Sequence, residues 1–425
     1  MYTKHKLNNG IRIVTEDIPY VKSVSIGLWV EAGSRYESKM NNGISHFIEH
    51  MLFKGTKNRS AKKIAEDIDS IGGQLNAFTS KECTCYYAKV LDSHLDIAID
   101  VLSDMLFNSI FDEKEIMKEK SVVTEEINMY EDSAEELAHD LLSQTIFDNH
   151  PLSFPILGKK NTIANINRKS ILEYFNLYYS PENLVISVVG NIDEEQVLNL
   201  LEEKFGDWKN SIKDIPNSPK PPFVKRNFIS KEKDTEQLHL CVGLEGVQES
   251  SDSLYSLLVL NNLFGGSMSS RLFQRVREDK GLAYSIYSYP STYKDTGTFT
   301  IYAGLNPKEI INLSEIIIQE IMNIKKNNFS SDEIYKSKEQ LKGNYILGLE
   351  STSSRMSALG KSELLRGKVN TQREIINKID EVSKRSINDL IEKIFNYNKM
   401  NIAYVGKLEN SDRVKNKLLN LYNKK

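Results

Sequence analysis

The stretch His46-Phe47-Ile48-Glu49-His50-Met51-Leu52-Phe53-Lys54-Gly55-Thr56 is the most informative part of this sequence. On a helix, His46 and His50 are four residues apart, so both imidazoles project from neighbouring turns towards one point. Glu49 lies between them around the helix axis, where it can take a proton from a metal-bound water. The apolar residues fall on the opposite side of the same helix, namely Ile44, Phe47, Ile48, Met51 and Leu52. The pattern therefore predicts a helix that is packed on one face and carries a polar triplet on the other. Two histidines four apart on an exposed helical face usually have no metal, so the motif alone does not decide between a metal site and an ordinary surface.

A site of this kind needs a third protein ligand, with one position left open for water. The segment 111–130 offers one, because Ile116, Glu119, Val123, Glu126, Ile127 and Tyr130 recur at helical spacing. A carboxylate on such a packed stripe is costly unless it is paired or binds a metal. From periodicity alone, Glu126 is equally well explained as a ligand or as a surface glutamate. Glu125 points to the far side and is expected to be solvated.

Taken together, these residues resemble the zinc site of the pitrilysin/insulinase family, the inverzincin metallopeptidases with an H-x-x-E-H motif. The words H-F-I-E-H-M-L-F-K-G-T and V-V-T-E-E-I resemble the branch of the mitochondrial processing peptidase β subunit and its bacterial relatives. The resemblance runs over essentially the whole chain. It implies that one Zn²⁺ per chain is held by His46, His50 and Glu126. It further implies that Glu49 is the general base and that Glu119 is the carboxylate that orients the site.

Two further segments match the substrate-binding parts of this family. Asn76, Ala77 and Phe78 match the sheet edge at which the family binds its substrate in extended form. Arg277 and Tyr284 match an arginine that holds the substrate and a tyrosine whose hydroxyl stabilises the oxyanion. From the residues alone, 76–78 is equally well a polar turn before a buried strand. Without the resemblance, Arg277 would be a surface charge and Tyr284 a core residue at the start of a strand.

An internal duplication organises the chain. A shift of 216 residues places four separate segments in register without gaps, for example Ile26-Gly27-Leu28 on Val242-Gly243-Leu244 and Val189-Gly190 on Val405-Gly406. A constant offset of this kind predicts two similar domains. We expect a zinc-binding catalytic domain at 1–212, a proline-rich linker at 213–226 and a homologous domain at 227–425.

The second half lacks the metal motif, because the same shift places Asn262, Gly265, Gly266 and Lys342 at the positions of the predicted ligands and base. It is therefore expected to serve as a wall, a substrate surface or both, and the resemblance implies that it contributes substrate-binding and transition-state residues. The resemblance implies an α+β fold in which each half is a mostly antiparallel sheet with helices packed on one side. It also implies that the two halves face each other across a cleft.

Periodicity in the first half predicts individual strands and helices. Strands are expected at 12–14, 24–30, 83–90 and 184–189, and helices at 44–53, 61–71, 93–105, 113–130 and 170–178. Ser60 is the expected N-cap of the second of these helices, and Gly72 its expected end. The acidic stretch 131–140 is expected to be a solvated helix face.

Composition excludes several classes of protein. The chain has 425 residues, 40% hydrophobic and 27% charged, which is typical of a globular protein with two or more domains. A net charge of −3 gives no reason to expect nucleic acid or an anionic membrane as a partner. Three cysteines without regular spacing fit a reducing compartment. The first ten residues lack the apolar core of a signal peptide, and no apolar run is long enough to span a bilayer, so we expect a cytoplasmic protein.

The sequence thus predicts a zinc-dependent endopeptidase, similar to a processing peptidase, that hydrolyses short or unfolded polypeptides. The alternative is a non-catalytic scaffold or partner subunit of the same fold, but such chains typically lack a ligand or the base, and this one has all of them. The resemblance implies a homodimer or a homologous partner subunit. The short glycine-rich segment 264–268 departs from the longer loop of the mitochondrial enzymes, which argues against presequence-like specificity.

Overall fold

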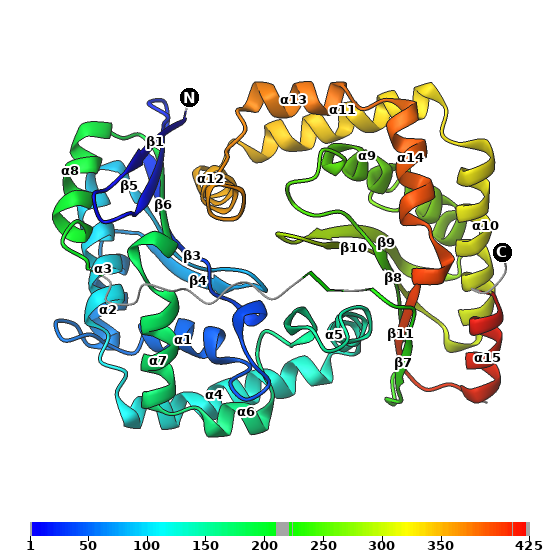
Figure 1. The fold of residues 1–425 in the computed structure, drawn as a ribbon, viewed down its shortest axis with the longest axis horizontal. Helices are drawn as coiled ribbons and strands as arrows, with labels where there is room; N and C mark the ends of the chain where they lie inside the picture. The colour runs from blue at the N-terminus through cyan, green and yellow to red at the C-terminus, as the bar shows by residue number, and fades with distance from the viewer. Residues whose placement is uncertain (1, 210–220, 223, 410, 422–425) are drawn as a thin grey trace. The chain divides into compact units, whose positions relative to one another are not determined.

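The computed structural model describes residues 2–209, 221–222, 224–409 and 411–421 (Figure 1). Most of the predicted linker at 213–226 lies outside these residues. The chain divides into two compact units. Unit 1 comprises Met1–Asn128, Phe154–Pro219 and Ile346–Thr371, and unit 2 comprises Met129–Ser153, Lys220–Tyr345 and Gln372–Lys425.

Unit 1 is built on a six-stranded sheet. Among its described strands, β2 and β6 pair in parallel and the other neighbours are antiparallel. The central strand β6 is buried along its whole length, which explains why 184–190 is almost continuously apolar rather than alternating. In sheet order, the strands are β1 (Tyr2–Lys6), β2 (Arg12–Asp17), β6 (Leu184–Gly190), β3 (Ser23–Val30), β5 (Thr84–Leu91) and β4 (Gln74–Thr79).

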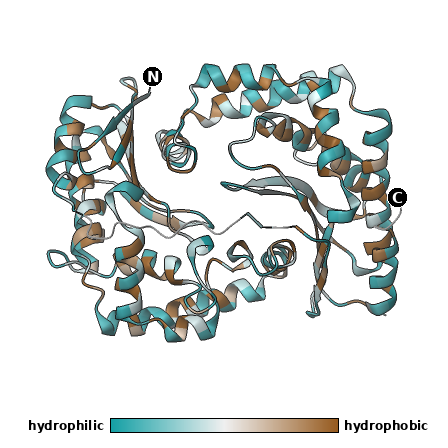
Figure 2. Cartoon of the chain, in the orientation of Figure 1, coloured by the Kyte–Doolittle hydropathy of each residue, from teal (hydrophilic) through white to brown (hydrophobic). Residues whose placement is uncertain are grey.

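One face of this sheet is covered by helices from the first half of the chain. Their apolar stripes form one core with the sheet, and Figure 2 shows brown and teal alternating along the helices, as expected for one-sided burial. Ser60 accepts a hydrogen bond from the backbone of Lys63 and so caps α2 as predicted. The helices of this part are α1 (Ile44–Leu52), α2 (Ala61–Asp69), α3 (Leu95–Asn108), α4 (Glu113–Asp132), α6 (Lys160–Asn165), α7 (Arg168–Tyr178) and α8 (Glu194–Phe205).

The opposite face of the same sheet is covered by α12 (Thr352–Arg366), which comes from the second half of the sequence. The helix lies close to the buried Trp29, and two glycines make room for it. A Cβ at Gly27 would lie 2.4 Å from the Sδ of Met356, and one at Gly360 would lie 2.2 Å from the indole nitrogen of Trp29. The close approach of helix and strand therefore depends on these missing side chains.

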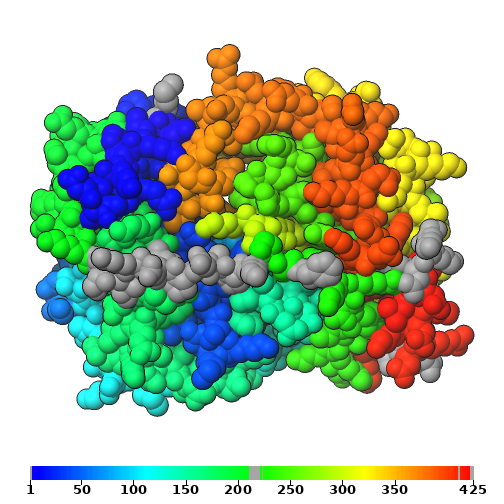
Figure 3. Space-filling model, viewed as in Figure 1, coloured from blue at the N-terminus to red at the C-terminus, as the bar shows by residue number. Residues whose placement is uncertain are grey.

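Unit 2 repeats this plan with a five-stranded sheet. Helices of the second half cover one face, and α5 (Ala134–Ile146), from the first half, covers the other. In sheet order, the strands are β7 (Phe228–Lys231), β11 (Asn401–Val405), β8 (Leu238–Glu245), β10 (Gly297–Leu305) and β9 (Ala283–Thr292). Helices α13 and α14 lie at the surface, where their orange side chains are visible in Figure 3. The helices are α9 (Leu254–Phe264), η5 (Phe273–Glu278), α10 (Ile310–Asn327), α11 (Ser331–Gly348), α13 (Gln372–Asp380), α14 (Lys384–Ile394) and α15 (Ser411–Leu421).

Short helical turns connect these elements. They are η1 (Ser34–Tyr36), η2 (Asp92–His94), η3 (Pro151–Ser153), η4 (Pro181–Asn183), η6 (Pro307–Glu309) and η7 (Tyr397–Lys399). Within the described residues, no helix combines the length and the apolar character that a membrane span requires.

The strand orders confirm the α+β fold and the internal duplication. Strands β2-β6-β3-β5-β4 of unit 1 correspond, in the same spatial order, to β7-β11-β8-β10-β9 of unit 2. The units nevertheless differ from the predicted domains 1–212 and 227–425, because each sheet is covered by a helix from the other half. The acidic stretch 131–140 is accordingly not a solvated face throughout, since Leu137 and Ala138 are buried in unit 2. A sequence repeat indicates two similar domains but not which sheet each helix covers.

The close packing of α12 on the sheet can be tested by adding one methyl group. Gly360→Ala is expected to lower the free energy of unfolding by about 1–3 kcal/mol, because the new Cβ collides with the rigid indole of Trp29. Gly343→Ala on α11 is the matched control, since among the described residues no atom beyond the helix's own nearby backbone lies within 4 Å of the added Cβ. Alanine also favours helix over glycine. Urea unfolding measures both variants. Equal stability of the two would show that Gly360 is not needed for close packing.

Candidate metal centre

Helix α1 is held at its N-terminus by a buried carboxylate. The helix follows Gly43, whose φ of 95° is readily adopted by glycine and which has no side chain to cap the helix. Glu37 takes this role and accepts hydrogen bonds from the backbone nitrogens of Gly43 at 2.7 Å and Ser45 at 2.9 Å. Burial raises the pKa of Glu37, although these bonds act to lower it. Glu37 thus anchors the helix that carries both histidines, and it was not predicted from the sequence.

The apolar face of α1 is buried as predicted, and α4 presents two carboxylates to the polar face. The buried stripe of α4 contains Ile116, Val123 and Ile127. Glu119 lies on the same side and is only 3% exposed. Glu126, two turns further along, is 41% exposed at its side chain.

Three side chains from these two helices converge. The Nε2 atoms of His46 and His50 lie 3.2 Å apart, and each lies 3.6 Å from Oε2 of Glu126. In the part of the chain that the structure describes, this is the group of His, Cys, Asp and Glu side chains whose ligand atoms are close enough for one metal ion.

The convergence fits a zinc ion. Two nitrogens bound tetrahedrally to one zinc at about 2.0–2.1 Å are roughly 3.3 Å apart, close to the observed separation of the imidazoles. Among the residues that the structure describes, Oε2 of Glu126 is buried and has no hydrogen-bond partner. Two imidazoles and one carboxylate also match a catalytic donor set, which leaves a position open. Their role as ligands stays a prediction.

The two histidines differ in charge. Burial, followed by the nearby His50, lowers the pKa of His46 to about 3, so its ring is neutral at physiological pH. Burial also acts to lower the pKa of His50. It is outweighed by the hydrogen bond and charge of Glu119 and by the charges of Glu126 and Glu49, so that pKa is raised.

Glu119 connects the metal centre to a lysine. Its Oε1 lies 2.7 Å from Nδ1 of His50, and its Oε2 lies 2.7 Å from Nζ of Lys54. Burial acts to raise the pKa of Glu119, but the hydrogen bonds from His50 and Lys54 prevail and lower it. Glu119 therefore fixes the orientation of the His50 ring. In this orientation, Nε2 of His50 is directed at Nε2 of His46 and at Glu126.

Glu49 lies on the same helix and is held by the neighbouring strand. The hydroxyl of Thr79, at the end of β4, donates a hydrogen bond to Oε2 of Glu49 at 2.5 Å. Burial raises the pKa of Glu49 against the opposing effects of this bond and of His50. Thr79 directly follows the predicted segment 76–78, but sequence patterns alone did not connect it with Glu49.

Comparison with known proteins now decides the family. The family model described as "Insulinase (Peptidase family M16)" matches residues 12–160, which include the metal centre, and "Peptidase M16 inactive domain" matches residues 165–341. The uncharacterised zinc protease YmxG of Bacillus subtilis is 50% identical over 93% of this chain and 96% of its own length. The chain belongs to peptidase family M16. The resemblance to the insulinase family is thereby confirmed.

Another relative agrees with this assignment, and two solved structures share the fold. An uncharacterised zinc protease of Rickettsia felis is 38% identical to this M16 chain and covers 92% of it, with 94% of its own length matched. A protease from Helicobacter pylori shares the fold with a TM-score of 0.92 at 23% identity, over 96% of this chain and 99% of that one. An M16 inactive domain from Pseudomonas fluorescens has a TM-score of 0.88 at 17% identity, over 96% and 98%.

The segment 76–78 of this M16 chain lies in β4, at the edge of the unit 1 sheet, so its interpretation as a polar turn is wrong. Asn76 accepts a hydrogen bond from the backbone nitrogen of Ala77 at 2.8 Å. Phe78 is 38% exposed and packs edge-on against Trp29 with ring centroids 5.5 Å apart. The strand has the edge position that the predicted peptide-binding role requires.

Arg277 and Tyr284 lie together in unit 2. The guanidinium of Arg277, in η5, lies 4.7 Å from the ring centroid of Tyr284 and 5.0 Å from that of Phe273. Tyr284 is 73% exposed, so its alternative interpretation as a core residue is wrong. The structure thus pairs these two residues, and their roles towards a substrate stay predictions.

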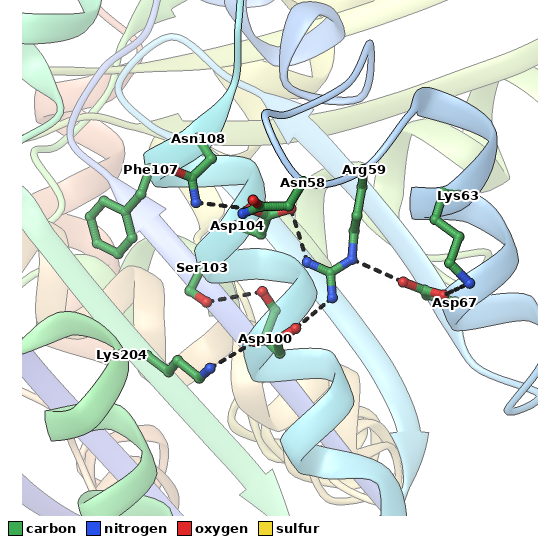
Figure 4. Close-up of a pocket in the computed structure, with 10 residues that line it drawn as sticks. All are labelled: Asn58, Arg59, Lys63, Asp67, Asp100, Ser103, Asp104, Phe107, Asn108 and Lys204. Atoms are coloured by element: carbon green, nitrogen blue, oxygen red, sulfur yellow. Dashed lines mark hydrogen bonds and ion pairs between the residues drawn. The ribbon is translucent and has the colours of Figure 1, made fainter.

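A polar cavity of about 530 Å³ lies elsewhere in unit 1 (Figure 4). Arg59 bridges α2 and α3 within it, 2.9 Å from both Asp67 and Asp104 and 2.5 Å from Asp100. Asp100 also pairs with Lys204 of α8 at 2.7 Å. Because these charges pair with one another, we interpret the cluster as structural. It holds the turn that follows α1 in place. The lining residues are Asn58, Arg59, Lys63, Asp67, Asp100, Ser103, Asp104, Phe107, Asn108 and Lys204.

The different pKa values of the histidines predict how zinc binding depends on pH. His46, with a pKa of about 3, has no proton to lose, whereas His50, whose pKa is raised, must release one. From about pH 6.5 down to about pH 5, the affinity for Zn²⁺ is expected to fall about tenfold per pH unit. Chelator competition in a Glu49→Gln background, which removes the titration of that carboxylate, measures the slope. A fall of about a hundredfold per unit would mean that both rings release protons.

Proposed function

We propose that this M16 protein is a zinc-dependent endopeptidase that hydrolyses short or unfolded polypeptides bound in extended form. The observation that carries the proposal is the convergence of His46, His50 and Glu126 beside the partly buried carboxylate of Glu49. The names of the relatives as zinc proteases support the choice of metal.

The arrangement supports a water-based mechanism. One Zn²⁺ per chain, held by His46, His50 and Glu126, would polarise a peptide carbonyl and lower the pKa of water to near ~7. Glu49 accepts the proton of the attacking water and returns it to the leaving amine. Its raised pKa helps it to hold this proton between the two steps, and Thr79 keeps its carboxylate in place.

Substrate binding is proposed for both units. The backbone of β4 offers a sheet edge to an extended peptide, and backbone pairing of this kind tolerates many sequences. We assign Asn76, Ala77 and Phe78 to this edge. We assign Tyr284 to hydrogen bonding with the oxyanion and Arg277 to holding the substrate, supported by the exposure of Tyr284 and its stacking with Arg277. We also propose that the chain works as a homodimer or together with a homologous partner subunit.

The alternative function is a scaffold or partner subunit that performs no chemistry. The presence of all three proposed ligands and of Glu49 favours the enzyme, because a scaffold has no need to retain a base beside metal ligands.

The two functions are separated by peptide cleavage. The purified chain, at a known oligomeric state, is incubated with a library of unstructured peptides, with Zn²⁺ and with a chelator, and products are identified by mass spectrometry. We expect internal cleavage that the chelator abolishes and added Zn²⁺ restores. A zinc-loaded chain that cleaves none of the peptides would support the scaffold.

A further inference from the structure

Lys54 lies two residues beyond the end of α1 and has no role in the mechanism above. Its Nζ lies 2.7 Å from one oxygen of Glu119, and the other oxygen lies 2.7 Å from Nδ1 of His50. The side chain of Glu119 is 3% exposed, whereas that of Lys54 is 31% exposed. A cation, a buried carboxylate and a ligand imidazole thus form a continuous chain that ends at the metal centre.

We propose that Lys54 is a positioning residue of the metal centre, which acts on His50 through Glu119. It holds the carboxylate in the orientation in which one oxygen accepts the Nδ1–H of His50. The Nε2 atom of that ring then stays directed at Nε2 of His46 and at Glu126. This inference rests on the proposed zinc site.

The buried carboxylate is the physical reason that a cation is needed. A carboxylate removed from water is costly unless each oxygen has a partner, and the imidazole of His50 supplies a partner for one oxygen only. Without Lys54, the second oxygen loses its charged partner. Glu119 is then expected to turn, and the acceptor that orients His50 is lost.

Charge repulsion alone would have the opposite effect on zinc affinity. The ammonium group repels a dication, so its removal would strengthen zinc binding if Coulomb repulsion dominated. The neighbouring Glu119 compensates this charge, and the partly exposed lysine is screened by water. Because positioning and repulsion have opposite signs, the direction of the change in affinity decides between them.

The test measures zinc affinity of the purified full chain by competition with a chromophoric chelator. Lys54→Met is expected to raise the dissociation constant for Zn²⁺ about tenfold, the lower end of the effect of losing an outer partner of a metal ligand. In a Glu119→Gln background, the same substitution is expected to have no further effect, because Lys54 acts through that carboxylate. A merely structural role of the lysine would not produce this coupling.

Lys57→Met is the matched control. It removes the same charge from an exposed position in the same turn, and zinc affinity is expected to stay within about twofold. Thermal unfolding of the metal-free proteins shows that each variant folds. Equal or tighter zinc binding by Lys54→Met overturns the proposal, and so does an equal loss in the Glu119→Gln background. Failure of the unmodified chain to bind Zn²⁺ overturns the zinc site as well, whereas zinc binding without peptide cleavage contradicts the peptidase function alone.

Discussion

Glu49→Gln is expected to lower the rate of peptide hydrolysis by about 10³-fold while the chain keeps its zinc. General acid–base catalysis by a positioned side chain typically contributes about 10²–10⁴-fold. Glu49 lies beside the converging group without belonging to it. Glutamine fills the same space and can still bond to Thr79, but it cannot accept the proton of the attacking water. Steady-state cleavage of a fluorogenic peptide and elemental analysis of zinc measure the two quantities.

A matched control for this loss is Glu66→Gln, which neutralises an exposed carboxylate on α2. Its activity is expected to stay within about twofold of the unmodified chain. Full activity of Glu49→Gln with normal zinc content would end the assignment of the general base. Loss of zinc in the same variant would instead show that Glu49 is a ligand.

Glu126→Gln is expected to abolish stable zinc binding. The substitution leaves two imidazoles, whereas the site needs three protein ligands, and a neutral amide is a weaker donor than a carboxylate. We expect the dissociation constant to rise by more than about 100-fold, since losing an outer partner of a ligand alone costs about 10–100-fold. Elemental analysis after dialysis is expected to find about one zinc per unmodified chain and almost none in the variant, with loss of activity in parallel.

The adjacent residue provides an unusually close control. Glu125 lies next to Glu126 on α4 but is exposed, and the converging group does not include it. Glu125→Gln removes the same charge and is expected to keep both zinc and activity. If both variants kept zinc, the carboxylate of Glu126 would not be a ligand, and the proposed centre would need another one.

Local periodicity predicted the elements that position the candidate site. The spacing of His46 and His50 and the stripe through Glu119 and Glu126 each describe one helix, and the structure contains both, as α1 and α4. The constant offset predicted the duplicated fold, which the matching strand orders confirm. These features are readable because each depends on residues a few positions apart or on a repeat along the chain.

Other features depend on contacts between distant parts of the chain. Packing decided that the helices 134–146 and 352–366 each cover the sheet built from the other half of the chain. The same holds for Thr79 beside Glu49 and for Lys54 beside Glu119, because a hydrogen bond across 30 or more residues leaves no periodic trace.

By itself, the sequence identified the candidate residues for the chemistry and the helical face that presents them, since a helix fixes the directions of its own side chains. Only the tertiary structure decided which carboxylate meets which imidazole and which cation holds it. Burial is the physical reason, because a charged group removed from water must find its partner wherever the fold brings one within hydrogen-bond distance.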